Sequence, residues 1–159
     1  MAWPRGPRAR RNPRATIVAV DWPSVLQVAQ ENAAASGVSH RYDVLPGNAF
    51  EVDLGSGYDL ILLTNFLHHF DLATNIQFLK KVYSALKTGG RAIAYEFVPD
   101  ENRISPPVTA KFAMIMLAAT PRGDAYPFSA FQEMFRAAGF MQPELVRIPG
   151  PESLVVARR

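Results

Sequence analysis

The architecture follows from one run, Tyr58-Asp-Leu-Ile-Leu-Leu-Thr64, which contains the apolar stretch Leu60–Leu63 and comes after the turn sequence Gly55-Ser56-Gly57. Its apolar continuity is typical of a strand that is buried on both faces. A second run of this kind, Ala15-Thr-Ile-Val-Ala-Val-Asp21, lies upstream and ends in an acid. We predict that both runs are strands of an α/β sheet.

The segments around these two strands predict further strands and helices. Helices are expected to begin at the capping boxes Ser24-Val-Leu-Gln27 and Thr74-Asn-Ile-Gln77 and to end at Gly37 and at Gly89-Gly90. The other predicted helices are 108–119 and 128–138, and the other predicted strands are 40–45, 91–98, 145–148 and 153–157. Strand, helix, strand occurs twice in succession, which predicts a parallel sheet with helices on both faces.

Length and composition limit the classes of protein to which the chain can belong. At 159 residues, 48% hydrophobic and 19% charged, it has the size of one globular domain. It contains no cysteine, which excludes disulfides and thiolate chemistry. The apolar stretches are too short to span a membrane, and the N-terminus does not resemble a secretory signal. We therefore expect a cytoplasmic protein without a membrane partner.

The positive charge of the chain is concentrated at its N-terminus. Five arginines and no acid occur in the first fourteen residues, and subtracting these five from the chain's +3 leaves −2 on the rest. A basic arm could contact nucleic acid, but no basic surface interleaved with aromatic residues follows it. We interpret residues 1–14 as a disordered basic extension and 15–159 as the folded domain, with nucleic acid as the least favoured partner.

Ligands of such sheets bind beyond the carboxyl ends of the strands, which selects candidates for a binding site. Asp21 ends the first strand, where a carboxylate can accept hydrogen bonds from ribose hydroxyls or can stabilise the following helix. Asn48-Ala49-Phe50 follows the second strand, where an amide can pair with an adenine edge, although Pro-Gly-Asn is also ordinary turn chemistry. Position leaves both alternatives open.

The same rule selects candidates for proton transfer. His68 and His69 follow the strand Tyr58–Thr64, and neighbouring loop residues are expected to point apart. One of them would suit a general base, and the other would pack against Phe66 or Phe70. Glu96 ends an apolar strand and needs a partner if it is buried, for which a histidine from the neighbouring strand end is suitable. No metal is implied.

These positions, taken in order, resemble the class I S-adenosylmethionine-dependent methyltransferases, closest to bacterial relatives of the small-molecule O-methyltransferases that include the hydroxyindole and plant phenolic enzymes. The resemblance is carried by Thr16–Pro23, Gly47–Phe50, Tyr58–Asp71, Leu86–Glu96 and Arg136–Phe140. It implies a Rossmann-like sheet, S-adenosylmethionine as cofactor and a small-molecule hydroxyl as methyl acceptor.

The resemblance also assigns roles to residues. Asp21, Trp22, Asn48, Ala49 and Phe50 would bind the cofactor. His68 matches the catalytic base of a His-Asp-Trp triplet, which is His68-His69-Phe70 here, and Glu96 matches an acid that orients the base. A second orienting acid of those enzymes falls near Ala125, beside Asp124.

The chain departs from the family pattern at its beginning. The first, central strand, its Gly-rich loop and an N-terminal dimerisation domain have no counterpart before Ala15, so the resemblance implies a truncated chain. The lost strand would lie between 15–21 and 58–64. We predict that these two strands close directly onto each other or that another chain fills the gap. Met1–Ala9 is too rich in proline to supply a central strand.

Three functional hypotheses follow. The first is an O-methyltransferase with His68 as base, in which a second copy of the chain is one candidate partner. The second is an inactive remnant that serves as a binding or interaction module. The third, a nucleic-acid-associated protein that uses its arginine arm, has the least support.

Overall fold

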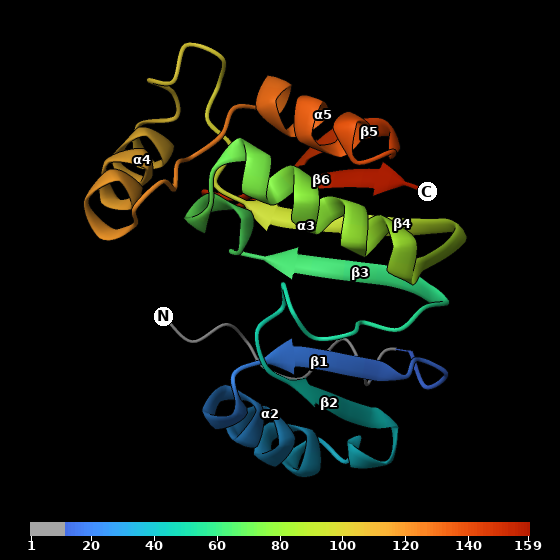
Figure 1. Ribbon diagram of the computed structural model, residues 1–159. Coiled ribbons are helices and arrows are strands. Elements are labelled where there is room, and N and C mark those ends of the chain that lie inside the picture. The colour runs from blue at the N-terminus through green and yellow to red at the C-terminus, as the bar shows by residue number, and fades with distance from the viewer. Residues whose placement is uncertain (1–11) are drawn as a thin grey trace. The chain divides into compact units, whose positions relative to one another are not determined.

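The computed structural model of the protein describes residues 12–159, and the chain forms two compact units (Figure 1). The N-terminal unit extends to Leu54, and the C-terminal unit comprises Gly55–Arg159. The predicted disordered extension lies almost entirely outside the described residues.

The N-terminal unit is one strand–helix–strand motif. It consists of β1 (Ile17–Asp21), α2 (Pro23–Ala35), a 3₁₀ turn (Ser39–Arg41) and β2 (Tyr42–Pro46). The two strands are parallel, as predicted, and their register runs from Ile17 opposite Tyr42 to Asp21 opposite Pro46. The carboxyl ends of both strands therefore meet at the same edge.

Helix α2 begins two residues earlier than a capping box at Ser24 requires. Trp22 is the N-cap without a side-chain bond, and Pro23 occupies the first turn. The predicted capping box is wrong because proline already suits the first helical position: it lacks an N–H, and its φ is fixed at a helical value. The predicted end is confirmed: Ser36 caps the helix, and Gly37 follows with a φ of +70°.

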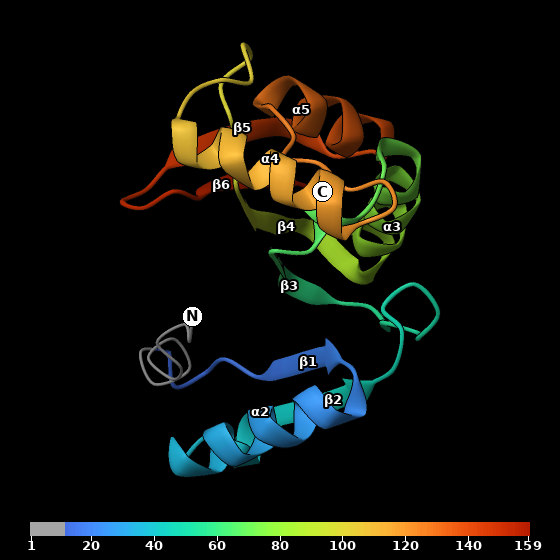
Figure 2. The ribbon, with the colours of Figure 1, turned by 90° about the vertical axis from the view of Figure 1, so that its left-hand side faces the viewer.

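The C-terminal unit is built on a four-stranded mixed sheet (Figures 1 and 2). Its strand order is β3-β4-β6-β5, in which β3 and β4 are parallel, as predicted, and the other neighbours are antiparallel. The elements, in chain order, are β3 (Tyr58–Thr64), a 3₁₀ turn (Leu67–His69), α3 (Leu72–Ala85), β4 (Leu86–Glu96), α4 (Pro107–Ala119), α5 (Phe128–Ala137), β5 (Met141–Arg147) and β6 (Ser153–Arg158).

Helices α3 and α5 pack next to each other over this sheet, and their apolar faces supply most of its core. The sheet contributes small residues where the helices approach, since Ala92, Ala94 and Ala157 are fully buried. Large side chains of the helices fill the space above them; Leu79, Val82, Phe131, Met134 and Phe135 are all at most 1% exposed.

Two predicted boundaries of α3 are wrong. The N-cap is Asp71, whose Oδ1 accepts a hydrogen bond from the backbone N–H of Thr74 at 2.8 Å, so the helix begins before the predicted capping box. The helix also ends at Ala85 rather than at Gly89-Gly90, because Leu86 is 1% exposed and pairs with Tyr58 as the first residue of β4. The glycines lie inside that strand, where Gly89 adopts a φ of +77°.

The strand β3 is present with the predicted bounds, but it is not buried on both faces. It pairs only with β4, and Leu60 and Leu62 are 45% and 44% exposed. Strand β1 pairs with β2 in a separate two-stranded sheet, and the predicted closure of β1 onto β3 stays a prediction. Each strand keeps one edge without a neighbouring strand among residues 12–159. Whether another chain pairs there is untested, and residues 1–9 lie outside the described part.

The described part of the chain, residues 12–159, holds no helix with the length and apolar character that crossing a membrane requires.

Candidate active site

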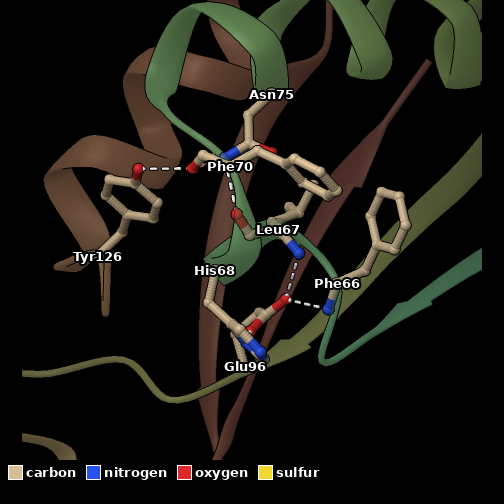
Figure 3. A network of polar contacts seen from close by, with 7 residues as sticks. All are labelled: Phe66, Leu67, His68, Phe70, Asn75, Glu96 and Tyr126. Atoms are coloured by element: carbon tan, nitrogen blue, oxygen red, sulfur yellow. Dashed lines mark hydrogen bonds and ion pairs between the residues drawn. The ribbon is translucent and has the colours of Figure 1, made fainter. Parts of the chain in front are cut away.

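The turn that follows β3 carries the candidate base (Figure 3). The chain leaves β3 at Asn65, whose φ of +52° lies in the left-handed region that asparagine tolerates better than most residues. The 3₁₀ turn Leu67–His69 follows and buries two of its residues, since Leu67 and His68 are 0% and 5% exposed. The imidazole of His68 is therefore held within the unit and does not extend into solvent.

Glu96 lies beneath this turn at the end of β4 and is fully buried. Its Oε1 accepts hydrogen bonds from the backbone N–H groups of Phe66 and Leu67, at 2.9 and 2.8 Å. Its Oε2 lies 2.6 Å from Nδ1 of His68. The prediction that Glu96 pairs with a histidine from the neighbouring strand end is confirmed, because the parallel register places Thr64 opposite Tyr95 and so brings the two strand ends together.

This pair defines what the imidazole can do. A carboxylate only accepts hydrogen bonds, so Nδ1 of His68 carries the proton of the contact, and in the neutral ring Nε2 keeps its lone pair. A buried ring with a fixed tautomer and a free Nε2 is suited to accept a proton from a hydroxyl group. The catalytic roles of His68 and Glu96 themselves stay predictions.

His69 does not point away from His68. The centroids of the two rings are 4.3 Å apart, which contradicts the expectation that neighbouring residues diverge. The ring of His69 also contacts Phe70, as predicted, with centroids 6.2 Å apart. Burial lowers the pKa of His69, the neighbouring His68 lowers it further, and Glu96 partly opposes both effects.

An aromatic wall adjoins His68. The rings of Phe112, on α4, and His68 meet edge to face, with their centroids 4.8 Å apart. Phe97 stacks on Phe112, with ring centroids 3.9 Å apart. This wall gives the candidate base an apolar neighbour on one side.

The region of the second expected acid contacts His68 through the main chain. Ala125 is fully buried, and the carboxylate of Asp124 binds Arg103 at 2.6 Å. The backbone N–H of Asp124 instead donates to the carbonyl of His68 at 2.9 Å. The part of the chain from residue 12 onward contains no group of three or more His, Cys, Asp or Glu side chains that could hold a metal ion.

The candidate cofactor residues belong to the N-terminal unit and lie at the carboxyl edge of its strands. Asp21 accepts a hydrogen bond from the backbone N–H of Trp22 at 2.8 Å, and its own carbonyl accepts one from Gly47 at 3.0 Å. The second bond joins the loop after β2 to the end of β1, so the structure brings Asp21 and the segment Asn48–Phe50 to one edge.

The loop after β2 is ordered by its own side chains. Asn48 Oδ1 accepts a hydrogen bond from the N–H of Phe50 at 3.1 Å, and Asn48 Nδ2 donates to Glu51 at 2.9 Å. Ala49 and Phe50 are half-buried, whereas Asp21 and Trp22 are exposed. Binding by these five residues stays a prediction.

Sequence reasoning missed Asn75 and Tyr126, which bind the backbone of residues 66–70, called the His68 turn from here on. Asn75 lies on α3 and is fully buried. A signal for it existed: Asn75 shares helical spacing with the apolar Leu79 and Val82, and a polar residue on a buried stripe needs partners. The residues around Tyr126 carry no comparable signal.

Comparisons with known proteins show the family of the chain. Residues 8–141 match the model of the O-methyltransferase domain family. The chain is 32% identical over 142 residues to 3-hydroxy-5-methyl-1-naphthoate 3-O-methyltransferase of Streptomyces sahachiroi, covering 89% of this chain and 41% of that enzyme. It is 31% identical over 138 residues to the S-adenosyl-L-methionine-dependent methyl transferase PigF of Serratia, covering 86% and 40% of the two chains.

Solved structures have the same fold. A protein from Nostoc punctiforme, whose description proposes an O-methyltransferase, superposes with a TM-score of 0.93 at 49% identity, over 95% of this chain and 46% of that one. The structure of PigF with SAH gives a TM-score of 0.84 at 30% identity, over 95% and 45%. The chain thus spans less than half the length of these relatives.

The expected Rossmann-like methyltransferase sheet with helices on both faces is therefore confirmed as a partial one. No strand precedes β1 among residues 12–159, so this part of the chain holds no counterpart of the expected first strand. Because the family model matches residues 8–141, which is most of the chain, the protein belongs to the O-methyltransferase domain family.

Proposed function

We propose that this chain carries the base and part of the cofactor site of an S-adenosylmethionine-dependent O-methyltransferase that acts on a hydroxyl group of a small molecule. The observation that carries the proposal is the buried pair of His68 and Glu96, with Nδ1 and Oε2 2.6 Å apart. Membership of the family supports it independently.

The residues present fit the adenosine end of the cofactor. Gly47 has a φ of +137°, and a Cβ on it would lie 2.6 Å from the side chain of Val52, so the loop that brings Asn48 beside the end of β1 needs a glycine there. Exposed Asp21 would bind the ribose, and Asn48, Ala49 and Phe50 would bind the adenine, with Trp22 beside them. The residues that would hold the amino-acid end are not among those the structure describes.

The side chains of the C-terminal unit would supply the proton chemistry. S-Adenosylmethionine, when bound, supplies a methyl group on a sulfonium, which a hydroxyl oxygen attacks. His68 Nε2 would accept the hydroxyl proton during that attack, and the positive charge that forms on the ring would be stabilised by Glu96. The aromatic wall of Phe112 and Phe97 would exclude water beside the reacting hydroxyl.

Partners and location are further parts of the proposal. A homodimer stays a prediction, as does a cytoplasmic location, and cell fractionation with size-exclusion chromatography would test both. A second functional candidate, an inactive remnant that binds another chain, is favoured by one observation: within the described part of the chain, one edge of β3 has no neighbouring strand, and Leu60 and Leu62 are exposed.

Calorimetric titration of the purified chain with S-adenosylhomocysteine tests the cofactor site. We expect micromolar binding, about −8 kcal/mol, that is lost in Asp21→Ala. Asp43→Ala is the matched control, because Asp43 is an exposed acid of β2 in the same unit, and it should bind as the unsubstituted chain does.

Methyl transfer from labelled S-adenosylmethionine to a panel of small phenols then tests the reaction. We expect turnover that falls by about 10²–10⁴-fold in His68→Ala while the affinity for S-adenosylhomocysteine is kept. A folded chain that binds no cofactor and transfers no methyl group would reject the enzyme in favour of the remnant.

A further inference from the structure

The His68 turn is fixed by hydrogen bonds from several elements, and only some of them involve the candidate catalytic pair. Glu96 binds the N–H groups of Phe66 and Leu67, which lie before His68 in the chain. The carbonyl groups of the turn are bound by other residues. In the view of Figure 3, Glu96 lies below the turn, Asn75 lies above it, and Tyr126 approaches from the side.

Asn75 connects the two ends of the turn. Its Nδ2 donates to the carbonyl of Leu67 at 2.9 Å and to the carbonyl of Phe70 at 3.1 Å. These carbonyls lie on either side of His68 in the chain, and the NH₂ group of an asparagine has two N–H donors. A single side chain of α3 thus fixes the distance between the residues that flank the base.

The environment of Asn75 indicates that its amide group serves to position the His68 turn. The residue is fully buried, and its Oδ1 has no hydrogen-bond partner. A buried amide oxygen without a partner is unfavourable, and a leucine of similar volume would avoid that cost. What a leucine cannot provide is the pair of donors to Leu67 and Phe70.

Tyr126 binds one of the same carbonyls from a second direction. Its hydroxyl donates to the carbonyl of Phe70 at 2.7 Å, and the ring is largely buried at 6% exposure. Two residues upstream, the N–H of Asp124 donates to the carbonyl of His68. The segment before α5 therefore runs along the turn.

Gly123 is the point of closest approach between this segment and the turn. A Cβ at Gly123 would lie 2.3 Å from the carbonyl oxygen of His68 and 2.4 Å from Oγ1 of Thr120. No side chain fits there without displacing the backbone of the base.

We propose that Asn75 and Tyr126 are positioning residues, which hold the carbonyls of Leu67 and Phe70 and thereby keep His68 Nδ1 on Glu96. This inference deepens the proposed function and rests on it for its catalytic meaning. The contact between Nδ1 and Oε2 is 2.6 Å long, and a shift of the turn by a fraction of that length would weaken it. Bonds on both sides of the turn prevent such a shift.

The test measures the Nδ1 proton of His68 by NMR, in the chain without cofactor. The protein has three histidines, so His68→Gln identifies the signal. The variants are Tyr126→Phe, which removes only a hydroxyl, and Asn75→Leu, which removes the amide at similar volume. Tyr83→Phe is the matched control, because Tyr83 lies on α3 against Phe140 and the hydroxyl is not part of the turn.

We expect solvent exchange of this proton to be about threefold faster in Tyr126→Phe and about tenfold faster in Asn75→Leu, as the loss of one or two neutral hydrogen bonds predicts. The control should exchange at the rate of the unsubstituted chain. If the chain is active, turnover should fall in the same order while the KM for the acceptor stays unchanged.

Two results would overturn the proposal. Variants that melt at a lower temperature but keep the Nδ1 proton of His68 as protected from exchange as before would show a purely structural role. If Asn75→Leu fails to fold, Tyr126→Phe alone still makes this test. Absence of a protected Nδ1 proton in the unsubstituted chain would contradict the geometry itself. Failure of the proposed function gives a different result: no methyl transfer in any variant, with the NMR differences still present.

Discussion

The candidate base and the candidate cofactor residues are held in different ways. In the C-terminal unit, the His68 turn is bound by side chains from the end of β4, from α3 and from the segment before α5. In the N-terminal unit, the side chains of Asp21 and Asn48 bind, among residues 12–159, partners at most three positions away. The candidate base is thus held by long-range contacts, whereas the side chains of Asp21 and Asn48 are held by local turns, and Asp21 stays exposed.

The two units also differ in their cores. The core of the N-terminal unit contains Ala33 and Val38, packed against Ile17 and Tyr42. The core of the C-terminal unit includes several fully buried large side chains, among them Phe131 and Phe135. Because two strands and one helix bury little apolar surface, we expect the N-terminal unit to be the less stable one.

The largest expected effect comes from exchanging one acid in each unit for alanine. Glu96→Ala removes the carboxylate that binds the N–H groups of Phe66 and Leu67 and the imidazole of His68, which should reduce the free energy of unfolding by about 3–5 kcal/mol. Asp21→Ala, at an exposed site, should change it by less than about 0.5 kcal/mol. Urea unfolding of both variants measures the difference. Equal losses would contradict the contrast between the two sites.

A smaller effect separates the backbones of the two units. Strand β4 is hydrogen-bonded on both sides, by β3 and β6, whereas β1 has one neighbouring strand among residues 12–159. We expect amide hydrogens of β1 to exchange at least about a hundredfold faster than those of Ala92 and Ala94 in β4. Hydrogen–deuterium exchange with mass spectrometry measures this ratio. Similar protection of both strands would show that the N-terminal unit is stabilised as strongly as the other.

Several elements of the C-terminal unit, and one contact of the candidate site, could be predicted from the sequence. The strands Tyr58–Thr64 and Ser153–Arg158 and the helix Pro107–Ala119 follow from continuous apolar runs and turn residues, within a residue at each end. The pairing of His68 with Glu96 also follows, because parallel strands bring their carboxyl ends to one edge and a buried acid needs a partner.

The remainder depends on contacts that no local pattern encodes. Both Asp71 and Thr74 could cap α3, and the structure selects Asp71, whose other oxygen binds Arg122 at 2.9 Å, 51 positions away in the chain. That contact also contributes to holding the pKa of Asp71 at about 2, after the hydrogen bonds from Thr74. The exposure of Leu60 and Leu62 likewise reflects a neighbour that β3 lacks among residues 12–159, and an apolar run does not reveal this.

The smallest expected effect compares one tyrosine from each unit at alkaline pH. Burial raises the pKa of Tyr126 to about 12, with the nearby carboxylates of Asp124 and Asp71 adding to it, and burial raises the pKa of Tyr42 as well. A phenol whose pKa is raised above its ordinary value of 10.0 on folding contributes stability that is complete below pH 10 and is lost as the pH rises toward 12.

For Tyr126 the loss has a structural cause, because the phenolate can no longer donate to the carbonyl of Phe70. We therefore expect the melting temperature to fall more steeply between pH 10 and 12 in the unsubstituted chain than in Tyr126→Phe, with Tyr42→Phe intermediate. Thermal melts followed by circular dichroism in this range measure the slopes. If Tyr42→Phe reduced the fall of the melting temperature with pH more than Tyr126→Phe does, ionisation of Tyr42 would destabilise the protein more than ionisation of Tyr126. That result would reverse the expected contrast between the two units.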